Sequence, residues 1–197
     1  MGRDAQGGGV RVPGLAGNDM RTDEGGRPAA LLWGSLTRFG LAVAVVVAAA
    51  DQAAKLWLLL GLDLGARGSV TLTPFLDLVL TWNPGISYGL FRQQGPLGQW
   101  ALIALKAIAV ALLWIWLARA SSRLTALSLG LIIGGAIGNA VDRLHWPGVM
   151  DFALFHLAIG QSRYDWYVFN LADVAIVAGV IGLLYETLIA NGAAKAP

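Results

Sequence analysis

Four long apolar runs constrain the fold of this chain more than any other feature. They cover residues 39–60, 97–118, 124–144 and 168–190. Each is close to the ~20 residues that a helix needs to cross ~30 Å of hydrocarbon. The chain is 56% hydrophobic, and most of its 14 Lys and Arg and 12 Asp and Glu lie outside the runs. We therefore expect an all-α membrane protein of one domain, with four transmembrane helices.

Lys and Arg are distributed unequally between the two sides of these spans. Four spans place both termini on one side, which carries Arg3, Arg11, Arg21, Arg27, Arg38, Arg119, Arg123 and Lys195. The other side carries Arg67, Arg92 and Arg163. Because cytoplasmic loops are enriched in Lys and Arg, we expect cytoplasmic termini. Aromatic residues are not interleaved with a basic stripe, so nucleic-acid binding is not expected.

The segments that flank the spans differ in character. Residues 1–37 are rich in Gly and Arg, include Pro13 and Pro28, and predict a disordered cytoplasmic extension before a membrane domain at 38–191. Residues 192–197 would form a short cytoplasmic tail. A secretory signal peptide is an alternative for the first run, because residues 48–50 are alanines that resemble a cleavage site. The apolar run resumes at Leu56, which favours a retained span.

Two outward loops connect the spans. Residues 71–83 are rich in Thr, Val, Leu and aromatic residues and are broken by Pro74, which predicts short strands at the membrane surface. The second loop, 145–167, carries Trp146, Tyr164, Trp166 and Tyr167, and such aromatic side chains favour the headgroup level. We expect a small strand-rich subdomain that faces outward and lies against the bilayer.

Polar residues within the spans gather near their outer ends. Ionisable groups in hydrocarbon are costly, so each one suggests a functional site. Asp51 and Lys55 have the i, i+4 spacing that allows them to pair, although they could form only a structural ion pair. Small residues at 134–138 allow close helix contact before the next polar group. The remaining polar positions are Asn139, Asp142, Arg143, Asn170 and Asp173.

Asp151 and Asp173 are the candidate acid–base pair. Two carboxylates held close together cannot both ionise easily, so they share one proton. The deprotonated Asp then activates a water while its protonated partner polarises a carbonyl. Two aspartates near a membrane surface are also compatible with a solvated or structural role. The chain has no Cys, and His145 and His156 lack zinc-ligand spacing, so no metal or cofactor is expected.

Five motifs in this order resemble bacterial lipoprotein signal peptidase, also called signal peptidase II. They are Asp51-Gln52-x-x-Lys55, Asn83-x-Gly85, Gly134-Gly135-x-x-Gly138-Asn139-x-x-Asp142-Arg143, Val149-Met150-Asp151-Phe152 and Phe169-Asn170-Leu171-Ala172-Asp173. The resemblance implies a four-span aspartic endopeptidase of the bacterial inner membrane that works without metal and is a target of globomycin. It implies cleavage of diacylglyceryl-modified prolipoproteins just before the lipidated cysteine, near the outer face.

The resemblance also assigns roles to individual residues. Asp151 and Asp173 match the catalytic pair. The family's substrate-binding or supporting positions correspond in this sequence to Asn83, Gly85, Asn139, Arg143, Asn170, Asp142, Asp51 and Lys55. The implied partners are prolipoproteins and membrane lipid, and we expect a monomer. Tyr88 departs mildly from the pattern, because Phe or Trp is expected there. Lys106, near the middle of the second span, is explained only by a helix contact or a cavity.

Two other interpretations compete with this one. Residues 85–89 match the Gly-x-Ser-x-Gly nucleophile elbow, which requires a strand, a tight turn and a helix with a nearby His and acid. Here the serine, Ser87, falls in an outward loop. A small transporter or assembly factor would also explain charges within spans. Transporters, however, usually place such charges near the midplane and often carry internal repeats, whereas these charges gather at one edge.

Overall fold

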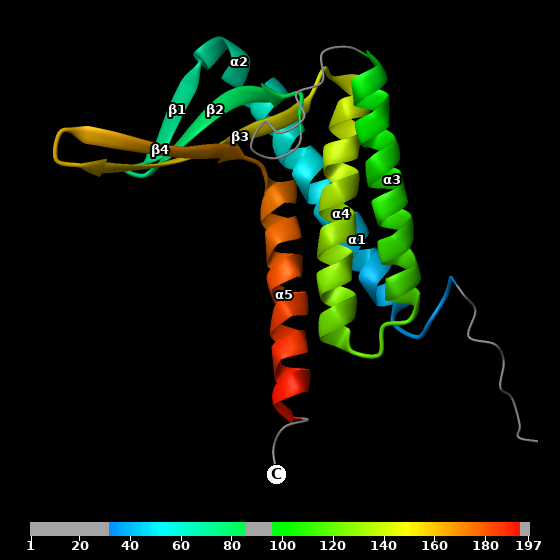
Figure 1. Ribbon diagram of the computed structural model, residues 1–197. Coiled ribbons are helices and arrows are strands. Elements are labelled where there is room, and N and C mark those ends of the chain that lie inside the picture. Colours follow the sequence, from blue (N-terminus) through cyan, green and yellow to red (C-terminus); the bar gives the residue numbers. More distant parts are fainter. Residues whose placement is uncertain (1–31, 86–95, 194–197) are drawn as a thin grey trace, which may run out of the picture.

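The computed structural model describes residues 32–85 and 96–193 (Figure 1). Over this part of the chain, four helices are long and apolar enough to cross a membrane, as predicted. The elements in order are α1 (Thr37–Leu56), the π-helical turn η1 (Trp57–Gly61), α2 (Leu64–Arg67), β1 (Ser69–Thr73), β2 (Leu76–Asn83), α3 (Pro96–Ala118), α4 (Arg123–His145), β3 (Val149–Ile159), β4 (Ser162–Phe169) and α5 (Leu171–Ala193). The predicted extension at 1–37 lies almost wholly outside the described residues, as do Ser87 and Tyr88.

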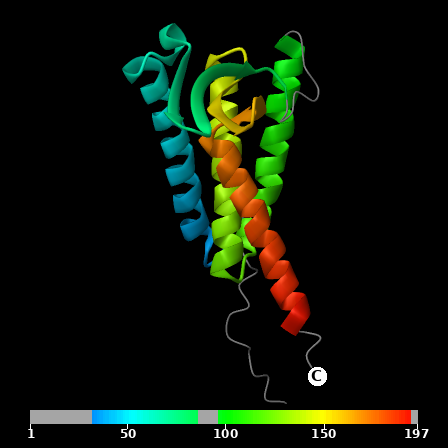
Figure 2. The ribbon, with the colours of Figure 1, turned by 90° about the vertical axis from the view of Figure 1, so that its left-hand side faces the viewer.

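The long helices run alongside one another, and the strands lie across one end of the bundle, here called the sheet end (Figures 1 and 2). The most buried of these helices is α4, which packs against α1, α3 and α5. The described strands pair antiparallel in the order β1-β2-β3-β4. The β3–β4 hairpin projects sideways from the bundle, across the direction of the helices (Figure 1).

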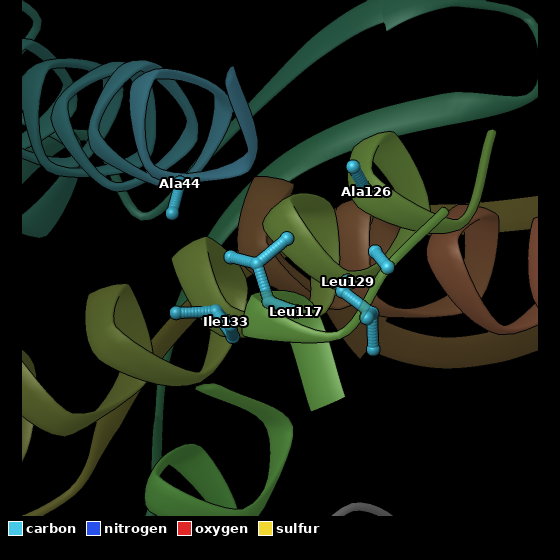
Figure 3. Packing of buried hydrophobic residues seen from close by; sticks show 6 residues of the cluster. Ala44, Leu117, Ala126, Leu129 and Ile133 are labelled. Atoms are coloured by element: carbon cyan, nitrogen blue, oxygen red, sulfur yellow. The ribbon is translucent and has the colours of Figure 1, made fainter. Parts of the chain in front are cut away.

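Buried apolar side chains form a cluster in the bundle and another under the sheet. The bundle cluster joins α1, α3 and α4 through Ala44, Leu117, Ala120, Ala126, Leu129 and Ile133 (Figure 3). The cluster under the sheet contains Leu58, Leu64, Leu78 and Met150. It joins η1 and α2 to β2 and β3. The sheet is therefore held to the end of α1 by apolar packing as well as by the chain connections.

Glycines on α4 allow it to approach two helices at backbone distance. A Cβ on Gly134 would lie 2.6 Å from the carbonyl oxygen of Ala44 on α1. A Cβ on Gly135 would lie 2.5 Å from the carbonyl oxygen of Ala172 on α5. Neither carbonyl can rotate away, so both contacts require glycine. The small-residue segment at 134–138 thus does what the sequence predicted.

The strand predictions were confirmed in the first loop and incomplete in the second. β1 and β2 cover most of residues 71–83 and flank Pro74. In the second loop the sequence predicted surface aromatics but not the β3–β4 hairpin, which turns at Gly160 with a φ of +62°. Apart from Asp151 and His156, residues 149–159 are apolar on both faces, so they lack the alternation that marks a half-buried strand.

The start of the fourth span was predicted three residues too early. Val168 and Phe169 belong to β4, and α5 begins at Leu171. Hydropathy does not distinguish an apolar strand from the helix that follows it, so the apolar run joined the two. Asn170 separates them, and its side chain caps the helix, as described below.

Charged side chains join β2 to the hairpin. The Asp77 carboxylate on β2 lies 2.7 Å from Arg163 on β4 and 3.2 Å from His156 on β3. Arg163 also lies 2.6 Å from Asp165. The hydrogen bond from Arg163 holds the pKa of Asp77 below its usual value. Arg163 therefore links the outer strand to β2 across β3.

Gly134→Ala tests the close contact between α4 and α1. Alanine favours the helix by about 1 kcal/mol over glycine, whereas overpacking against a rigid carbonyl costs about 1–3 kcal/mol. We expect the steric term to prevail and the melting temperature in detergent to fall. The control is Ile137→Val, at an exposed position of the same helix, which should change it little. A Gly134→Ala protein as stable as wild type would contradict the contact.

Candidate functional site

Asp151 lies near the start of β3 and is 3% exposed. Its Oδ2 accepts a hydrogen bond of 3.1 Å from Asn83 Nδ2, at the end of β2. Its Oδ1 accepts one of 2.6 Å from Asn170 Nδ2. Two side-chain amides thus hold this carboxyl where the sheet meets the bundle, and both of them are residues that the sequence singled out.

Asp173 lies in the first turn of α5 and forms a reciprocal cap with Asn170. Asn170 Oδ1 accepts from the Asp173 backbone N–H at 2.9 Å, and Asp173 Oδ2 accepts from the Asn170 N–H at 3.2 Å. This is the capping-box arrangement, with Asn and Asp in place of the usual Ser or Thr and Glu. The positive end of the helix dipole also favours a carboxylate there. The cap fixes both where α5 starts and where Asp173 sits.

Amides of Asn139 and Asn170 connect the two aspartates. Asn170 Nδ2 also lies 3.0 Å from Asn139 Oδ1, and Asn139 Nδ2 donates to Asp173 Oδ1 at 3.0 Å. A continuous hydrogen-bonded path therefore runs from Asp151 through Asn170 and Asn139 to Asp173. Asn170 is 1% exposed, so this path lies in the protein interior. Side chains from α4, α5 and β3 are brought together, as the sequence predicted.

Lys55 lies at the centre of a buried ion cluster. Its Nζ is 2.7 Å from Asp51 and 2.7 Å from Asp142. All three side chains are at most 4% exposed. The i, i+4 pairing of Asp51 with Lys55 is confirmed, and Asp142 of α4 joins it as a further partner. Lys55 Nζ also lies 3.4 Å from Asn139 Oδ1, which joins the ion cluster to the amide path.

Each carboxylate of this cluster holds the backbone beside one of the candidate catalytic aspartates. Asp51 Oδ1 accepts from the N–H of Ala172 at 3.0 Å, next to Asp173. Asp142 Oδ2 accepts from the N–H of Met150 at 3.0 Å, next to Asp151. Hydrogen bonds to ionised carboxylates are roughly twice as strong as neutral ones. The ion cluster thus positions both aspartates through their backbone neighbours.

Gln52 is a supporting residue whose role the sequence did not predict. Its Nε2 donates to Asp142 Oδ1 at 2.8 Å and to the carbonyl oxygen of Gly138 at 3.1 Å. It therefore joins α1 to α4 beside Lys55. Its position next to Asp51 in the first motif could have indicated this role. It was missed because a neutral side chain in a span does not carry the energetic cost that draws attention to a charged one.

Arg143 holds the segment that follows β2. Its guanidinium is buried and donates to the carbonyl oxygen of Gly85 and, at 3.3 Å, to that of Asn139. The Gly85 N–H in turn donates to Asn83 Oδ1 at 3.0 Å. Arg143 and Gly85 therefore fix the position of Asn83, whose amide donates to Asp151.

Both aspartates line one cavity of about 500 Å³. Its polar end also includes Asn83. Its apolar lining comes from Trp166, Tyr167, Val168 and Phe169 of β4 and from Val174, Val177, Ala178 and Ile181 of α5. The α5 residues recur at helical spacing, so they form one continuous face. The sequence predicted the polar end of this cavity and not its apolar wall.

The environment of Asp151 favours its protonated form. Burial first, and the nearby charge of Asp173 second, raise its pKa to about 6. Hydrogen bonds from Asn83 and Asn170 oppose this shift without cancelling it. Within the described residues, His, Asp and Glu do not form any group of three that could hold a metal ion.

This fold and site define a multi-pass membrane protein with two linked carboxylates, one buried and one half-buried, at the head of an apolar cavity. Residues 43–189 match the family model described as signal peptidase (SPase) II. Relatives named lipoprotein signal peptidase include one from Rhodopseudomonas palustris (strain TIE-1), 58% identical, and one from Nitrobacter hamburgensis, 59% identical. Both matches span 160 residues, which are 81% of this chain and 98% of the relative.

A solved bacterial membrane enzyme shares the fold, with a TM-score of 0.65 at 23% identity over 81% of this chain and 92% of that one. The chain belongs to the signal peptidase II family. It is therefore a peptidase that removes signal peptides, and a multi-pass protein of the bacterial inner membrane. This membership rejects the alternative of a transporter or assembly factor and confirms the family resemblance seen in the motifs.

Lys55→Met tests the importance of the ion cluster. Removing one partner leaves Asp51 and Asp142 buried without their cation, which costs about 3–5 kcal/mol in buried ion pairs. We expect a large loss of thermal stability in detergent. The comparison variant is Arg163→Met, which removes a half-exposed cation and leaves His156 beside its buried partner Asp77, so a smaller loss is expected. Equal losses in the two variants would mean that Lys55 does not organise the fold.

Proposed function

We propose that Asp151 and Asp173 are the catalytic dyad of this peptidase. The proposed reaction removes the signal peptide from diacylglyceryl-modified prolipoproteins by hydrolysing the bond before the lipidated cysteine. The observation that carries the proposal is that both carboxyls line one cavity and are linked through Asn139 and Asn170. The names of the relatives support a lipoprotein precursor as the substrate.

The proposed mechanism uses one proton shared by the dyad. The ionised carboxylate takes a proton from a water molecule, and the resulting hydroxide attacks the scissile carbonyl carbon. The protonated carboxyl donates to the carbonyl oxygen, which gives a tetrahedral intermediate. As the intermediate collapses, one of its hydroxyl groups returns a proton to the dyad and re-forms the carbonyl, while the departing amine takes the proton that the dyad gained from water. The raised pKa of Asp151, about 6, supports a pair that retains one proton to a higher pH than an ordinary Asp would.

The remaining site residues have supporting roles in this proposal. Asn83, Asn139 and Asn170 orient the carboxyls through their amides. Arg143 and Gly85 hold the strand end that carries Asn83. Asp51, Lys55 and Asp142 fix the backbone next to each catalytic residue.

The apolar wall of α5 supports a substrate that is already in the membrane. Val174, Val177, Ala178 and Ile181 continue the cavity from Asp173 along the span. We place the signal helix of the substrate against this wall, while its acyl chains remain in the lipid. An acyl chain contributes ~0.8 kcal/mol per buried CH₂ to membrane anchoring. Lipidated precursors should therefore be cleaved in preference to soluble peptides.

We further propose that the sheet end faces outward, with cytoplasmic termini, and that the protein acts as a monomer in contact with lipid. Arg119 directly follows α3 and Arg123 begins α4, at the end of the bundle away from the sheet. Their placement supports that end as cytoplasmic. Tyr164, Trp166 and Tyr167 on the projecting hairpin are exposed, as expected of aromatic side chains at the headgroup level.

Asn substitutions test the dyad. We expect Asp151→Asn and Asp173→Asn to lose at least about 10³-fold in cleavage of a diacylglyceryl-modified prolipoprotein, because neither variant retains the acid–base pair. The assay uses purified protein in detergent with chelator present. The control is Asp165→Asn, which changes an exposed carboxylate on β4 and should retain activity. Activity surviving in either dyad variant would remove that residue from the catalytic pair, and wild-type activity lost to chelator alone would indicate a metal.

The pH dependence of cleavage gives a second test. The reaction needs one proton on the dyad, and the pKa of Asp151 beside the charged Asp173 is raised to about 6. As pH rises above this value, Asp151 loses its proton and the dyad becomes doubly ionised. We therefore expect kcat/KM to decline by up to about tenfold per pH unit on the alkaline side. A decline that already begins near pH 4, the ordinary Asp value, would contradict the raised pKa.

A further inference from the structure

The β3–β4 hairpin carries part of the cavity wall beyond the edge that β2 supports. On the hairpin side, the pairing of β2 with β3 ends at Leu76 and Phe155, and the hairpin projects from there (Figure 1). From Phe155 to Ile159 on β3, His156 alone is buried. The projecting part therefore has little buried support of its own, although β4 lines the cavity that contains both candidate catalytic aspartates.

Trp166 and Tyr167 form a β-bulge within this wall. The register of β3 and β4 shifts beyond the pair Leu154–Val168, and the two aromatic residues oppose Phe155 alone. A bulge bends its strand and changes the direction of the side chains that it carries. Both bulge residues line the cavity, and their rings meet edge to face with centroids 5.9 Å apart. The direction of this part of the wall therefore depends on how the hairpin is held beyond the bulge.

Asp77 on β2 holds the hairpin on the turn side of this bulge. It is 6% exposed, and its Oδ2 lies 2.7 Å from Arg163 Nη2 on β4 and 3.2 Å from His156 Nε2 on β3. One buried carboxylate thus contacts both strands of the hairpin. Asp165 also pairs with Arg163, but it lies on the same strand and is half-exposed. Of these two carboxylates, Asp77 is the one that connects the hairpin to the rest of the sheet.

We propose that Asp77 is a positioning residue for substrate binding, which holds the hairpin so that Trp166 and Tyr167 face the segment bound along α5. This inference rests on the proposed function, in which that segment is the signal helix of the precursor. Asp77 is not among the described residues that line the cavity, so it acts through the hairpin and not on the reacting bond. Because aromatic rings supply a large contact area, a change in their direction weakens binding.

Asp77→Asn tests this role, because asparagine has nearly the same size and no charge. We expect KM for a diacylglyceryl-modified prolipoprotein to rise roughly three- to tenfold, with kcat changed less than about twofold. The control is Asp165→Asn, which removes the exposed carboxylate partner of Arg163 and should leave both constants unchanged. A second variant, Arg163→Met, removes the cation from the same contact and should also raise KM. Wild-type constants in both Asp77→Asn and Arg163→Met would contradict the role.

A double-mutant comparison tests whether Asp77 acts through the bulge. Trp166 and Tyr167 are exposed, so a protein with Trp166→Ala and Tyr167→Ala should fold and have a raised KM. In that background Asp77→Asn should change KM less than about twofold, because the side chains that it positions are absent. An undiminished effect of Asp77→Asn would mean that the bulge does not carry the effect, and would overturn the inference.

A distance measurement follows the hairpin without a need for activity. The chain has no Cys, so Ser162→Cys beside the hairpin turn and Leu184→Cys at an exposed position of α5 can each carry a spin label. Pulsed electron paramagnetic resonance then gives the distribution of distances between the two labels. This distribution should be broader in Asp77→Asn than in wild type, and unchanged in Asp165→Asn.

The results separate this inference from the proposed function. If Asp151→Asn and Asp173→Asn are inactive, while Asp77→Asn has the distance distribution and the KM of wild type, the positioning role is wrong and the dyad stands. A broader distribution with an unchanged KM would also overturn the role, because the hairpin would then move without an effect on binding. If the two dyad variants remain active, the dyad itself is wrong.

Discussion

The structure depends on one buried contact, in which Lys55 on α1 lies between Asp51 of the same helix and Asp142 of α4. Buried ion pairs are weak evidence for stability, because desolvation offsets much of the attraction. Here the ion pairs matter because they fix the positions of neighbouring backbone segments. The same two carboxylates also accept the N–H groups of Ala172 and Met150. A single lysine thus sets the relation between the start of α5 and the start of β3, which carry the two candidate catalytic aspartates.

Asn170 connects this scaffold to the proposed chemistry. It caps α5, and the same side chain donates to Asp151. The first turn of a helix leaves N–H groups without helical partners, and a cap normally only satisfies them. Here the cap also carries hydrogen bonds from one carboxyl toward the other through Asn139. A change at Asn170 would consequently disturb both the start of α5 and the geometry of the proposed dyad.

Much of this arrangement could be predicted from the sequence, because the physical signals are strong. Apolar length identifies the spans, and costly charges such as Asp51 and Lys55 identify where the helices meet. The β3–β4 hairpin was missed because its apolar residues do not alternate, and the start of α5 was misplaced for a related reason. Gln52 was missed because an amide in a span is less conspicuous than a charge. Lys106 was noticed in the sequence, and the structure places it partly buried on α3.

The apolar face of α5 below the dyad has a consequence for the recognition of many different precursors. From Asp173 to Ile181 it extends about 12 Å along the helix axis, and the cavity residues along it are Val174, Val177, Ala178 and Ile181. A wall of this kind offers no hydrogen bond by which one apolar segment could be told from another of similar length. The wall therefore responds to the hydrophobicity and length of a bound segment and not to its particular amino-acid sequence. With the signal helix on this wall as proposed, one enzyme accepts many different apolar segments, and the choice of the bond to be cleaved falls to the polar end of the cavity.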